Sequence, residues 1–185
     1  MKYMICSDIH GSSYYTEKLL EKFNEGNYDK LIILGDVLYH GPRNDLPQMY
    51  DCKKVIKMLN NIKEKIICVK GNCDSEVDQM VLEFKLNDYY FFEHKGRKVH
   101  LTHGHIYNYD NVFPFMDEND ILFYGHFHVP FIMEKYNLWF CNPGSVSLPK
   151  QNTSHSYIEL NDEKIIIFEL IGGQVVEEKN IVGER

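Results

Sequence analysis

The sequence predicts an α/β fold in which two mixed β-sheets pack face to face with helices on the outside. Short apolar runs over 2–7, 31–34 and 65–70 alternate with segments of helical periodicity in the first half. This β-α-β-α-β order favours a parallel sheet with right-handed crossovers. The second half carries strand-like runs joined by short turns, which favours mostly antiparallel pairing. A chain of 185 residues can bury a sizeable core, and we expect one domain over 1–185.

The first half is organised around Leu31–Asp36, in which four apolar residues lead into Gly35 and Asp36. Such a run is typical of a strand buried on both faces. Asp36 therefore follows the carboxyl end of a strand, which is where ligands bind in open α/β sheets. The other elements expected here are a strand over 2–7, a helix over 15–23 that begins at Ser12 or Ser13 and stops at Gly26, a helix that begins at Asp51 or Cys52, and a strand over 65–70.

The second half is predicted to begin with a hairpin that turns around Lys95, Gly96 and Arg97. Its two strands cover 89–94 and 98–102. A short helix is expected within 108–118. The remaining strands are expected over 121–124, 131–136, 138–141, 156–160, 164–170 and 174–181.

Composition limits the function classes. The apolar share of 44% and the charged share of 25% are those of an ordinary globular protein. The net charge of −7 argues against a broad nucleic-acid-binding face and suits a protein that holds cations. We expect no membrane span and no signal peptide, because no apolar run is long enough for a span and the one before Asp8 is too short for a signal. Five cysteines without framework spacing favour reduced thiols and a cytoplasmic location.

Polar clusters follow five of the predicted strands. If the backbone is extended there, residues two apart point the same way, so the pairs Asp8/His10 and His126/His128 each reach one point. Carboxylate, imidazole and amide groups suit Mn²⁺, Fe²⁺ or Zn²⁺ better than Ca²⁺. A single Asp or His at a strand end is usually a turn or cap residue, so the weight lies in the combination. The seven candidate ligands are Asp8, His10, Asp36, Asn72, His103, His126 and His128.

Seven ligands are too many for one metal ion with an open coordination position. They suit two ions that share a bridging carboxylate, and Asp36 is the candidate bridge. Two-metal sites of this kind stabilise both the attacking and the leaving oxygen in a phosphoryl displacement.

The motifs SDIHG, LGDVLYHGPRN, GNCD, THGH, GHFHVP and NPGSVS resemble those of the calcineurin-like metallophosphoesterases, and within that family the small bacterial YfcE-type phosphodiesterases. The resemblance spans about residues 1–150. It implies a four-layer α/β/β/α sandwich with a dinuclear metal site. It also implies that Asp74 orients a neighbouring group. By family role, Asp8, His10, Asp36 and His128 would hold one ion, and Asp36, Asn72, His103 and His126 the other.

Cys73 departs from the family pattern, which usually has a histidine after the Gly-Asn pair. That histidine is expected to steady the phosphoryl oxygens or to protonate the leaving group. A thiol, with a reference pKa of about 8.5, is a poorer donor. Cys73 is either a weakened substitute or a small residue that fills a tight turn, and both interpretations stay open here. Arg43, on the loop after Asp36, either pairs with a phosphate or is solvated.

The expected function is hydrolysis of phosphodiester bonds by a hydroxide that bridges two divalent metals, with Mn²⁺ favoured and Fe²⁺ or Zn²⁺ as alternatives. The substrate is expected to be a small phosphodiester, with no stable nucleic-acid partner; a homo-oligomer is left open. Two other functions remain as alternatives: a non-catalytic scaffold like the retromer subunit of the same fold, and a phosphomonoesterase or protein phosphatase. The filled ligand set favours an enzyme. The candidate catalytic residues are Asn72, Cys73, Asp74 and His103.

Overall fold

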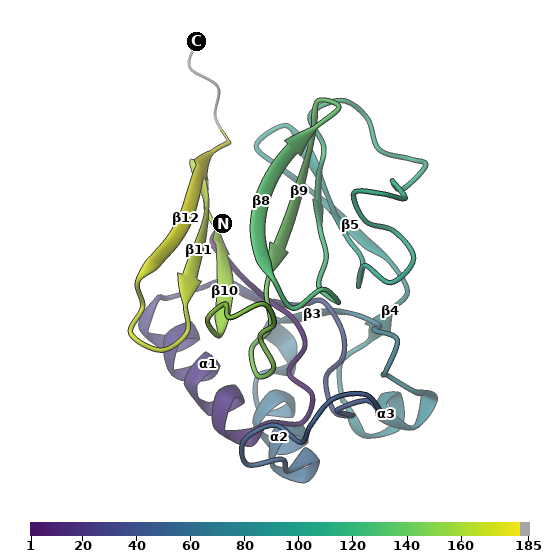
Figure 1. Cartoon of the computed structure of the whole chain (residues 1–185), viewed down its shortest axis with the longest axis vertical. Helices are drawn as coiled ribbons and strands as arrows, with labels where there is room; N and C mark the ends of the chain where they lie inside the picture. The colour runs from purple at the N-terminus through teal and green to yellow at the C-terminus, as the bar shows by residue number, and fades with distance from the viewer. Residues whose placement is uncertain (182–185) are drawn as a thin grey trace.

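The computed structural model describes residues 1–181 and contains two mixed β-sheets that pack face to face (Figure 1). The prediction of two mixed sheets is therefore confirmed. The seven-stranded sheet has the order β12-β11-β10-β1-β2-β3-β4, and the five-stranded sheet has the order β5-β6-β7-β9-β8. Strands β1, β2, β3 and β4 pair in parallel, whereas β10, β11 and β12 pair antiparallel.

The strands of the larger sheet are β1 (Tyr3–Cys6), β2 (Lys30–Ile33), β3 (Ile66–Val69), β4 (Leu86–Asn87), β10 (Ser156–Leu160), β11 (Lys164–Glu169) and β12 (Val175–Asn180). Those of the smaller sheet are β5 (Tyr90–His94), β6 (Arg97–Leu101), β7 (Ile121–Phe123), β8 (Pro130–Lys135) and β9 (Leu138–Pro143). The helices are α1 (Ser13–Glu25), α2 (Cys52–Asn60), α3 (Glu76–Val81) and the 3₁₀ turn η1 (Lys63–Lys65).

The strands β1 and β2 are buried on both faces, as their continuous apolar runs predict. Met4 and Ile33 pack with Leu19 of α1 in the core between the sheet and the helices. Ile5 and Ile32 point the other way, into the core between the two sheets. Each strand therefore joins two cores, which makes its carboxyl end a rigid support for the loop that follows.

The helix ends follow the expected signals. The Ser12 side chain accepts a hydrogen bond from the Tyr15 N–H and caps α1, and Gly26 ends this helix. Asp51 caps α2 in the same way. The helix α3 was not predicted, although its signal is present: Ser75 and Asp78 form a reciprocal capping box.

The outer face of the five-stranded sheet is covered by an irregular segment, 104–120. The helix predicted within 108–118 is wrong. The Asn108 side chain accepts hydrogen bonds from the N–H groups of Asp110 and Asn111, as a helix N-cap would. Pro114 stands within the expected helix, where it lacks an N–H and disfavours helical backbone at the residue before it. Tyr109 and Met116 of this segment pack on Phe140 and its buried neighbours. The helices thus lie on the other side of the molecule, against the seven-stranded sheet (Figure 1).

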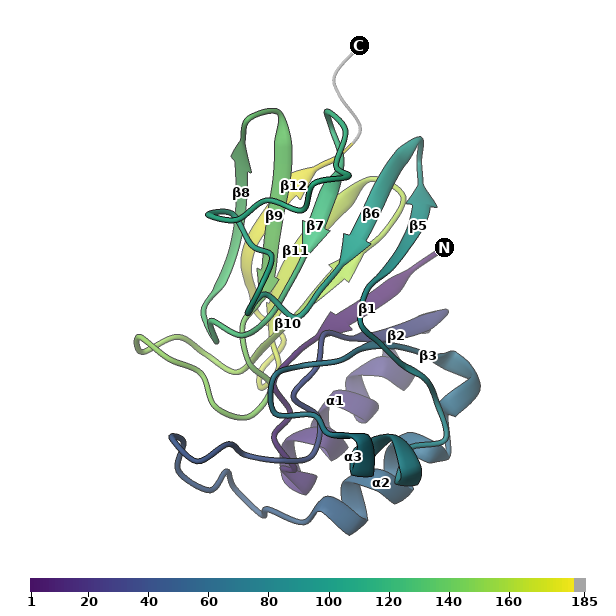
Figure 2. The same cartoon turned by 90° about the vertical axis from the view of Figure 1, so that its right-hand side faces the viewer.

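The carboxyl ends of parallel strands from both sheets meet at one edge of the sandwich, as can be followed in Figure 2. The Asp8 N–H donates to the Gly35 carbonyl at 3.1 Å, and the Gly125 N–H donates to the His103 carbonyl at 2.8 Å. The His126 N–H donates to Asp8 Oδ2 at 3.0 Å and so joins the two sheets. This edge gathers all five polar clusters that the sequence placed at strand ends.

Candidate metal centre

The structure brings the seven predicted ligands together in two overlapping groups. In the first group, Asp8 Oδ1 lies 3.5 Å from His10 Nε2 and 3.2 Å from His128 Nε2. The two imidazole Nε2 atoms are 3.4 Å apart. These three residues follow β1 and β7, one strand from each sheet.

The second group surrounds His103, which follows β6. Its Nε2 lies 3.0 Å from Asn72 Oδ1 and 3.3 Å from His126 Nδ1. Asp36 lies between the two groups, because its Oδ2 is 3.5 Å from His103 Nε2 and 3.7 Å from His10 Nε2. One carboxylate oxygen thus faces both sets of ligands.

The backbone at these loops is left-handed, so the expected extended conformation is wrong. Positive φ values occur at Asp8 (57°), His10 (48°), Asp36 (54°), His126 (64°) and His128 (58°). Non-glycine residues seldom adopt this region, although Asp and His do so more often than most, and each instance costs about 1–3 kcal/mol. Asp8 and His10 still converge, with Asp8 Oδ1 3.5 Å from His10 Nε2, whereas His126 and His128 enter different ligand groups instead of reaching one point. Strain of this kind is typical of functional sites.

Two glycines allow the loops to approach closely. Gly35 has a φ of 92°, and a Cβ there would lie 2.5 Å from the Gly71 nitrogen. A Cβ on Gly71 would lie 2.1 Å from Asp36 Oδ1. Side chains at these two positions would therefore force the loops after β2 and β3 apart.

Three of the imidazoles are oriented by backbone carbonyls. His10 Nδ1 lies 2.7 Å from the Tyr39 carbonyl, His103 Nδ1 2.6 Å from that of Leu34, and His128 Nδ1 2.5 Å from that of Leu148. A carbonyl only accepts, so each Nδ1 carries the hydrogen and donates it. Nε2 of each neutral ring is then a lone-pair donor directed into the centre, which is the usual arrangement for a metal-binding histidine.

The chemistry of the centre fits divalent cations. Asp8 Oδ1 is buried without a hydrogen-bond partner among the described residues. His10 Nε2 and His128 Nε2 face one another as acceptors when both rings are neutral. Acceptor atoms at such distances need a proton or a cation between them, and burial makes an unpaired polar atom costly. Two groups of side chains place their ligand atoms within 4.8 Å of one another, close enough to hold one metal ion. They are Asp8, His10 and His128, and Asp8, Asp36 and His103.

The ionisation of the metal-free centre supports this fit. Burial lowers the pKa of His103, but Asp36 and Asp8 outweigh burial and raise that pKa to about 9. Burial raises the pKa of Asp8, yet its contacts with His10 and His128 hold it well below its usual range. Burial lowers the pKa of His126, and the adjacent His103 lowers it further, to about 4. Burial likewise raises the pKa of Asp36, but its contact with His103 outweighs burial and lowers that pKa. Asp8 is therefore ionised at neutral pH and His126 is uncharged.

Asp74 supports the centre from behind. Its carboxylate accepts from the N–H groups of Asp36 at 2.8 Å, Val37 at 2.8 Å and Gly71 at 2.7 Å. It therefore binds the loop after β3 to the loop after β2. Its placement suits the orienting role that the family resemblance implies.

Cys73 lies beside Asp36. Its backbone N–H donates to Asp36 Oδ1 at 2.8 Å, which leaves Oδ2 to face the imidazoles. Its thiol lies within 4.8 Å of ligand atoms of both His10 and Asp36. Burial and the Asp36 charge raise the pKa of this thiol to about 12, so it stays neutral at pH 7.

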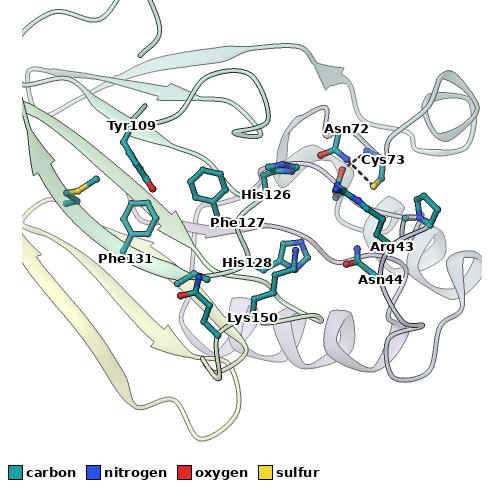
Figure 3. Close-up of a pocket in the computed structure, with 16 residues that line it drawn as sticks. Arg43, Asn44, Asn72, Cys73, Tyr109, His126, Phe127, His128, Phe131 and Lys150 are labelled. Atoms are coloured by element: carbon teal, nitrogen blue, oxygen red, sulfur yellow. Dashed lines mark hydrogen bonds between the residues drawn. The ribbon is translucent and has the colours of Figure 1, made fainter. Parts of the chain in front are cut away.

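A large pocket opens at the metal centre (Figure 3). Its volume is about 1050 Å³, and Arg43, Asn72 and Cys73 lie on one side of His126 and His128. Tyr109, Phe127 and Phe131 lie on the other side (Figure 3). The sequence reasoning missed these aromatic residues and Lys150. The one available signal was the alternation of Phe131 and Met133, which puts both on the same face of β8.

Comparison with known proteins agrees with this geometry. The family model of the calcineurin-like phosphoesterase superfamily domain matches residues 1–163. The chain belongs to this superfamily. It is also 45% identical over 177 residues to the phosphodiesterase YfcE of Escherichia coli (strain K12), an alignment that covers 90% of this chain and 96% of that protein. The resemblance to YfcE-type calcineurin-like proteins is confirmed.

Solved structures extend the comparison. The structure of YfcE, a phosphoesterase from E. coli, superposes with a TM-score of 0.95 at 42% identity and covers 98% of this chain and 100% of that one. The zinc complex of Vps29 from Entamoeba histolytica has a TM-score of 0.61 at 21% identity, covers 98% and 100%, and shares the fold. Within residues 1–181, none of the helices is sufficiently long and apolar to cross a membrane.

Proposed function

We propose that this calcineurin-like protein is a phosphodiesterase that requires two divalent metal ions. The observation that carries the proposal is the position of Asp36, whose Oδ2 faces His10 in one ligand group and His103 in the other. Asp8, His10 and His128 would hold one ion with Asp36. Asn72, His103 and His126 would hold the other with the same carboxylate. When bound, the ions would activate a shared water as the attacking hydroxide and neutralise charge on the phosphoryl oxygens.

The residues of the chain itself position these parts. The carbonyls of Leu34, Tyr39 and Leu148 fix the three imidazoles, and Asp74 fixes the loop that carries Asp36. Arg43 lies on the rim of the pocket, where its guanidinium suits an anionic phosphate. The thiol of Cys73 is neutral and is a weak acid, so departure of the leaving group would receive little help from it.

The metal we propose is Mn²⁺, with Fe²⁺ or Zn²⁺ as alternatives, because four of the seven ligands are imidazoles. The substrate is a small phosphodiester, and the protein acts as one domain in a reducing, cytoplasmic environment. The five cysteines are free thiols in the structure, which suits such a location. A purely scaffolding role does not explain why all seven candidate ligand positions are filled.

The experiment removes bound metal from the protein with a chelator, adds back one metal at a time, and measures hydrolysis of bis(p-nitrophenyl) phosphate. Activity is expected to disappear on stripping and to return best with Mn²⁺. Mg²⁺ should restore little, because it prefers oxygen ligands and keeps its waters. Equal activity with Mg²⁺, or full activity of stripped protein in chelator, would contradict the proposed ligand chemistry. Hydrolysis of p-nitrophenyl phosphate in parallel measures any monoesterase activity.

A further inference from the structure

The pocket at the metal centre extends well beyond the space that a phosphate group needs. Its volume of about 1050 Å³ lies just above the range of about 300–1,000 Å³ that is usual for pockets that bury whole small molecules. Past His126 and His128 it is bounded by apolar side chains that we call the aromatic wall. The wall consists of Tyr109, Phe127, Val129, Phe131 and Met133.

The three rings of the wall pack edge to face. The centroids of Tyr109 and Phe127 are 5.8 Å apart with an interplanar angle of 76°, and those of Tyr109 and Phe131 are 6.0 Å apart at 71°. Both phenylalanines also contact the ring of Tyr124, at 5.6 Å and 5.8 Å. Because Tyr124 is fully buried, it gives the two rings a fixed support.

Tyr109 is held from the outside although it lies in the irregular segment 104–120. Lys135 Nζ donates to the Tyr109 carbonyl at 3.5 Å and lies 5.6 Å from its ring centroid. The Tyr109 side chain is therefore anchored to β8, the same strand that provides Phe131. The wall is preformed by contacts within the protein.

The wall is only half-buried, and its free surface faces the cavity. Figure 3 shows Phe127 next to the two histidines, with Tyr109 and Phe131 beyond it. A diester whose phosphorus lies at the metal centre would thus direct one of its two ester groups onto the wall. Ring edges and faces set at these angles receive another ring in offset or edge-to-face contact, and the Met133 sulfur also favours aromatic neighbours.

We propose that the aromatic wall is a binding subsite for a planar aromatic ring carried by one ester group of the substrate. This inference rests on the proposed phosphodiesterase function and narrows its substrate class to diesters with an aryl or similarly flat heteroaromatic group. The subsite acts through binding. It is therefore separate from any effect of Cys73 on the departure of a leaving group.

The test measures binding without turnover. Benzyl(methyl)phosphinate and cyclohexylmethyl(methyl)phosphinate carry the same charge and nearly the same bulk, and neither has an ester bond to hydrolyse. They differ in whether the six-membered ring is flat and aromatic. Calorimetry with Mn²⁺-loaded protein is expected to show that the benzyl compound binds about 2- to 10-fold more tightly, the range for one aromatic contact. Equal affinities, or tighter binding of the cyclohexyl compound or of hexyl(methyl)phosphinate, would overturn the proposal.

Two variants from different elements locate the preference. Phe131→Leu and Tyr109→Leu keep apolar bulk but remove a ring, and each is expected to reduce the benzyl preference at least by half. Phe91→Leu is the matched control, because Phe91 is 56% exposed on β5 and does not line the pocket. A thermal melt checks the fold of each, and either wall variant that folds decides the test. A preference unchanged in a folded wall variant would contradict the assignment of the wall.

The outcome is independent of the test of catalysis. Hydrolysis of methyl p-nitrophenyl phosphate reports whether the protein is a diesterase. The phosphinate affinities report whether the wall selects a flat ring. If the protein does not hydrolyse the diester, the ratio of phosphinate affinities still decides whether the wall selects a flat ring.

Discussion

The two halves of the candidate metal centre differ in how firmly the fold holds them. Asp8, His10 and His128 have exposures of 0%, 0% and 3%. The rings of His10 and His128 are each oriented by a backbone carbonyl. This buried half lies at the edge where the two sheets meet, and the backbone orients its rings.

The other half borders the pocket. Asn72 is exposed and His126 is half-buried, and both line the cavity together with Cys73. Only His103, which is 2% exposed, gives this open half an anchor like those of the buried half. From this difference we expect the buried half to bind its ion tightly. The open half would exchange its ion more readily and would contact the substrate.

Asp36 joins the two halves, so its replacement is expected to have the largest effect. Asp36→Asn keeps the size of the side chain and its acceptor for the Cys73 N–H, but removes the charge that both ions would share. Turnover of bis(p-nitrophenyl) phosphate should fall about 10²- to 10³-fold. Metal content should also fall. Asp162→Asn, at an exposed salt bridge remote from the centre, is the control. Wild-type turnover with two ions bound would refute the bridging role.

The two halves should respond differently to loss of one histidine. His128→Ala is expected to weaken retention of the tightly held ion at least about 10- to 100-fold, the range known for groups that merely orient a ligand. His126→Ala should leave one ion bound after dialysis while turnover is lost. Metal analysis of both variants after the same dialysis gives the comparison. If the two variants retained the same number of metal ions per chain, the two halves would not differ in how tightly they hold metal.

The pH dependence of metal binding is expected to follow His103. Its pKa of about 9 means that the metal-free imidazole is protonated at neutral pH, and metal ligation requires its neutral form. The apparent affinity for Mn²⁺ should therefore rise about tenfold per pH unit between pH 7 and 9 and then level off. His126, whose pKa is about 4, should add no dependence in this range. Calorimetry in buffers of different ionisation enthalpy measures the proton released, and zero release at pH 7 would contradict the expectation.

The same shift predicts how the metal-free fold responds to pH. The folded pKa of His103 lies above the unfolded value of 6.5, so its contribution to stability is complete below pH 6.5 and is lost as pH rises through about 9. The Tm of the stripped protein should therefore fall across this pH window, and it should fall more steeply than the Tm of the Mn²⁺-loaded protein.

Cys73 is expected to give the smallest effect, and one that depends on the substrate. Cys73→His should raise kcat/KM about tenfold for diesters with alkyl leaving groups, less than the 10²–10⁴ typical of an optimally placed acid. It should change p-nitrophenyl substrates little, because that group leaves without a proton. Cys73→Ala should be mild on p-nitrophenyl substrates.

Rates across leaving groups of graded pKa give a Brønsted slope for each variant. Parallel slopes for wild type and Cys73→His would show that position 73 does not act on the leaving group. A large loss of metal in Cys73→Ala would instead make the thiol a ligand.

The sequence singled out the candidate ligand positions because each one follows an apolar run. Asp8 and Asp36 follow the neighbouring parallel strands β1 and β2, whose carboxyl ends lie at one edge of the sheet. His103 follows β6 of the other sheet, so its place beside them depends on how the two sheets pack. The left-handed backbone was not predictable from spacing: Asp8 and His10 are two apart in either conformation. It depends on the contacts of these loops with the other sheet, such as the Asp8 carbonyl accepting from Ser145 Oγ.

Local side-chain chemistry explains the errors in secondary structure. The apolar spacing within 108–118 and the turn at Asn108 resemble the start of a helix, but Pro114 lacks an N–H and disfavours helical backbone at the residue before it. Ser75 and Asp78 signal a helix that lacks apolar periodicity. The aromatic wall combines a loop residue, Tyr109, with Phe131 of β8, and only the tertiary fold brings these two together.

The most direct test of the two-ion arrangement is a titration of stripped protein with Mn²⁺. Hydrolysis of bis(p-nitrophenyl) phosphate is measured at each addition, and bound metal is measured in the same samples. The first equivalent should fill the buried half and leave activity low, and activity should rise steeply with the second equivalent and level off at two. Full activity at one equivalent, or saturation with two ions bound and no hydrolysis, would contradict it.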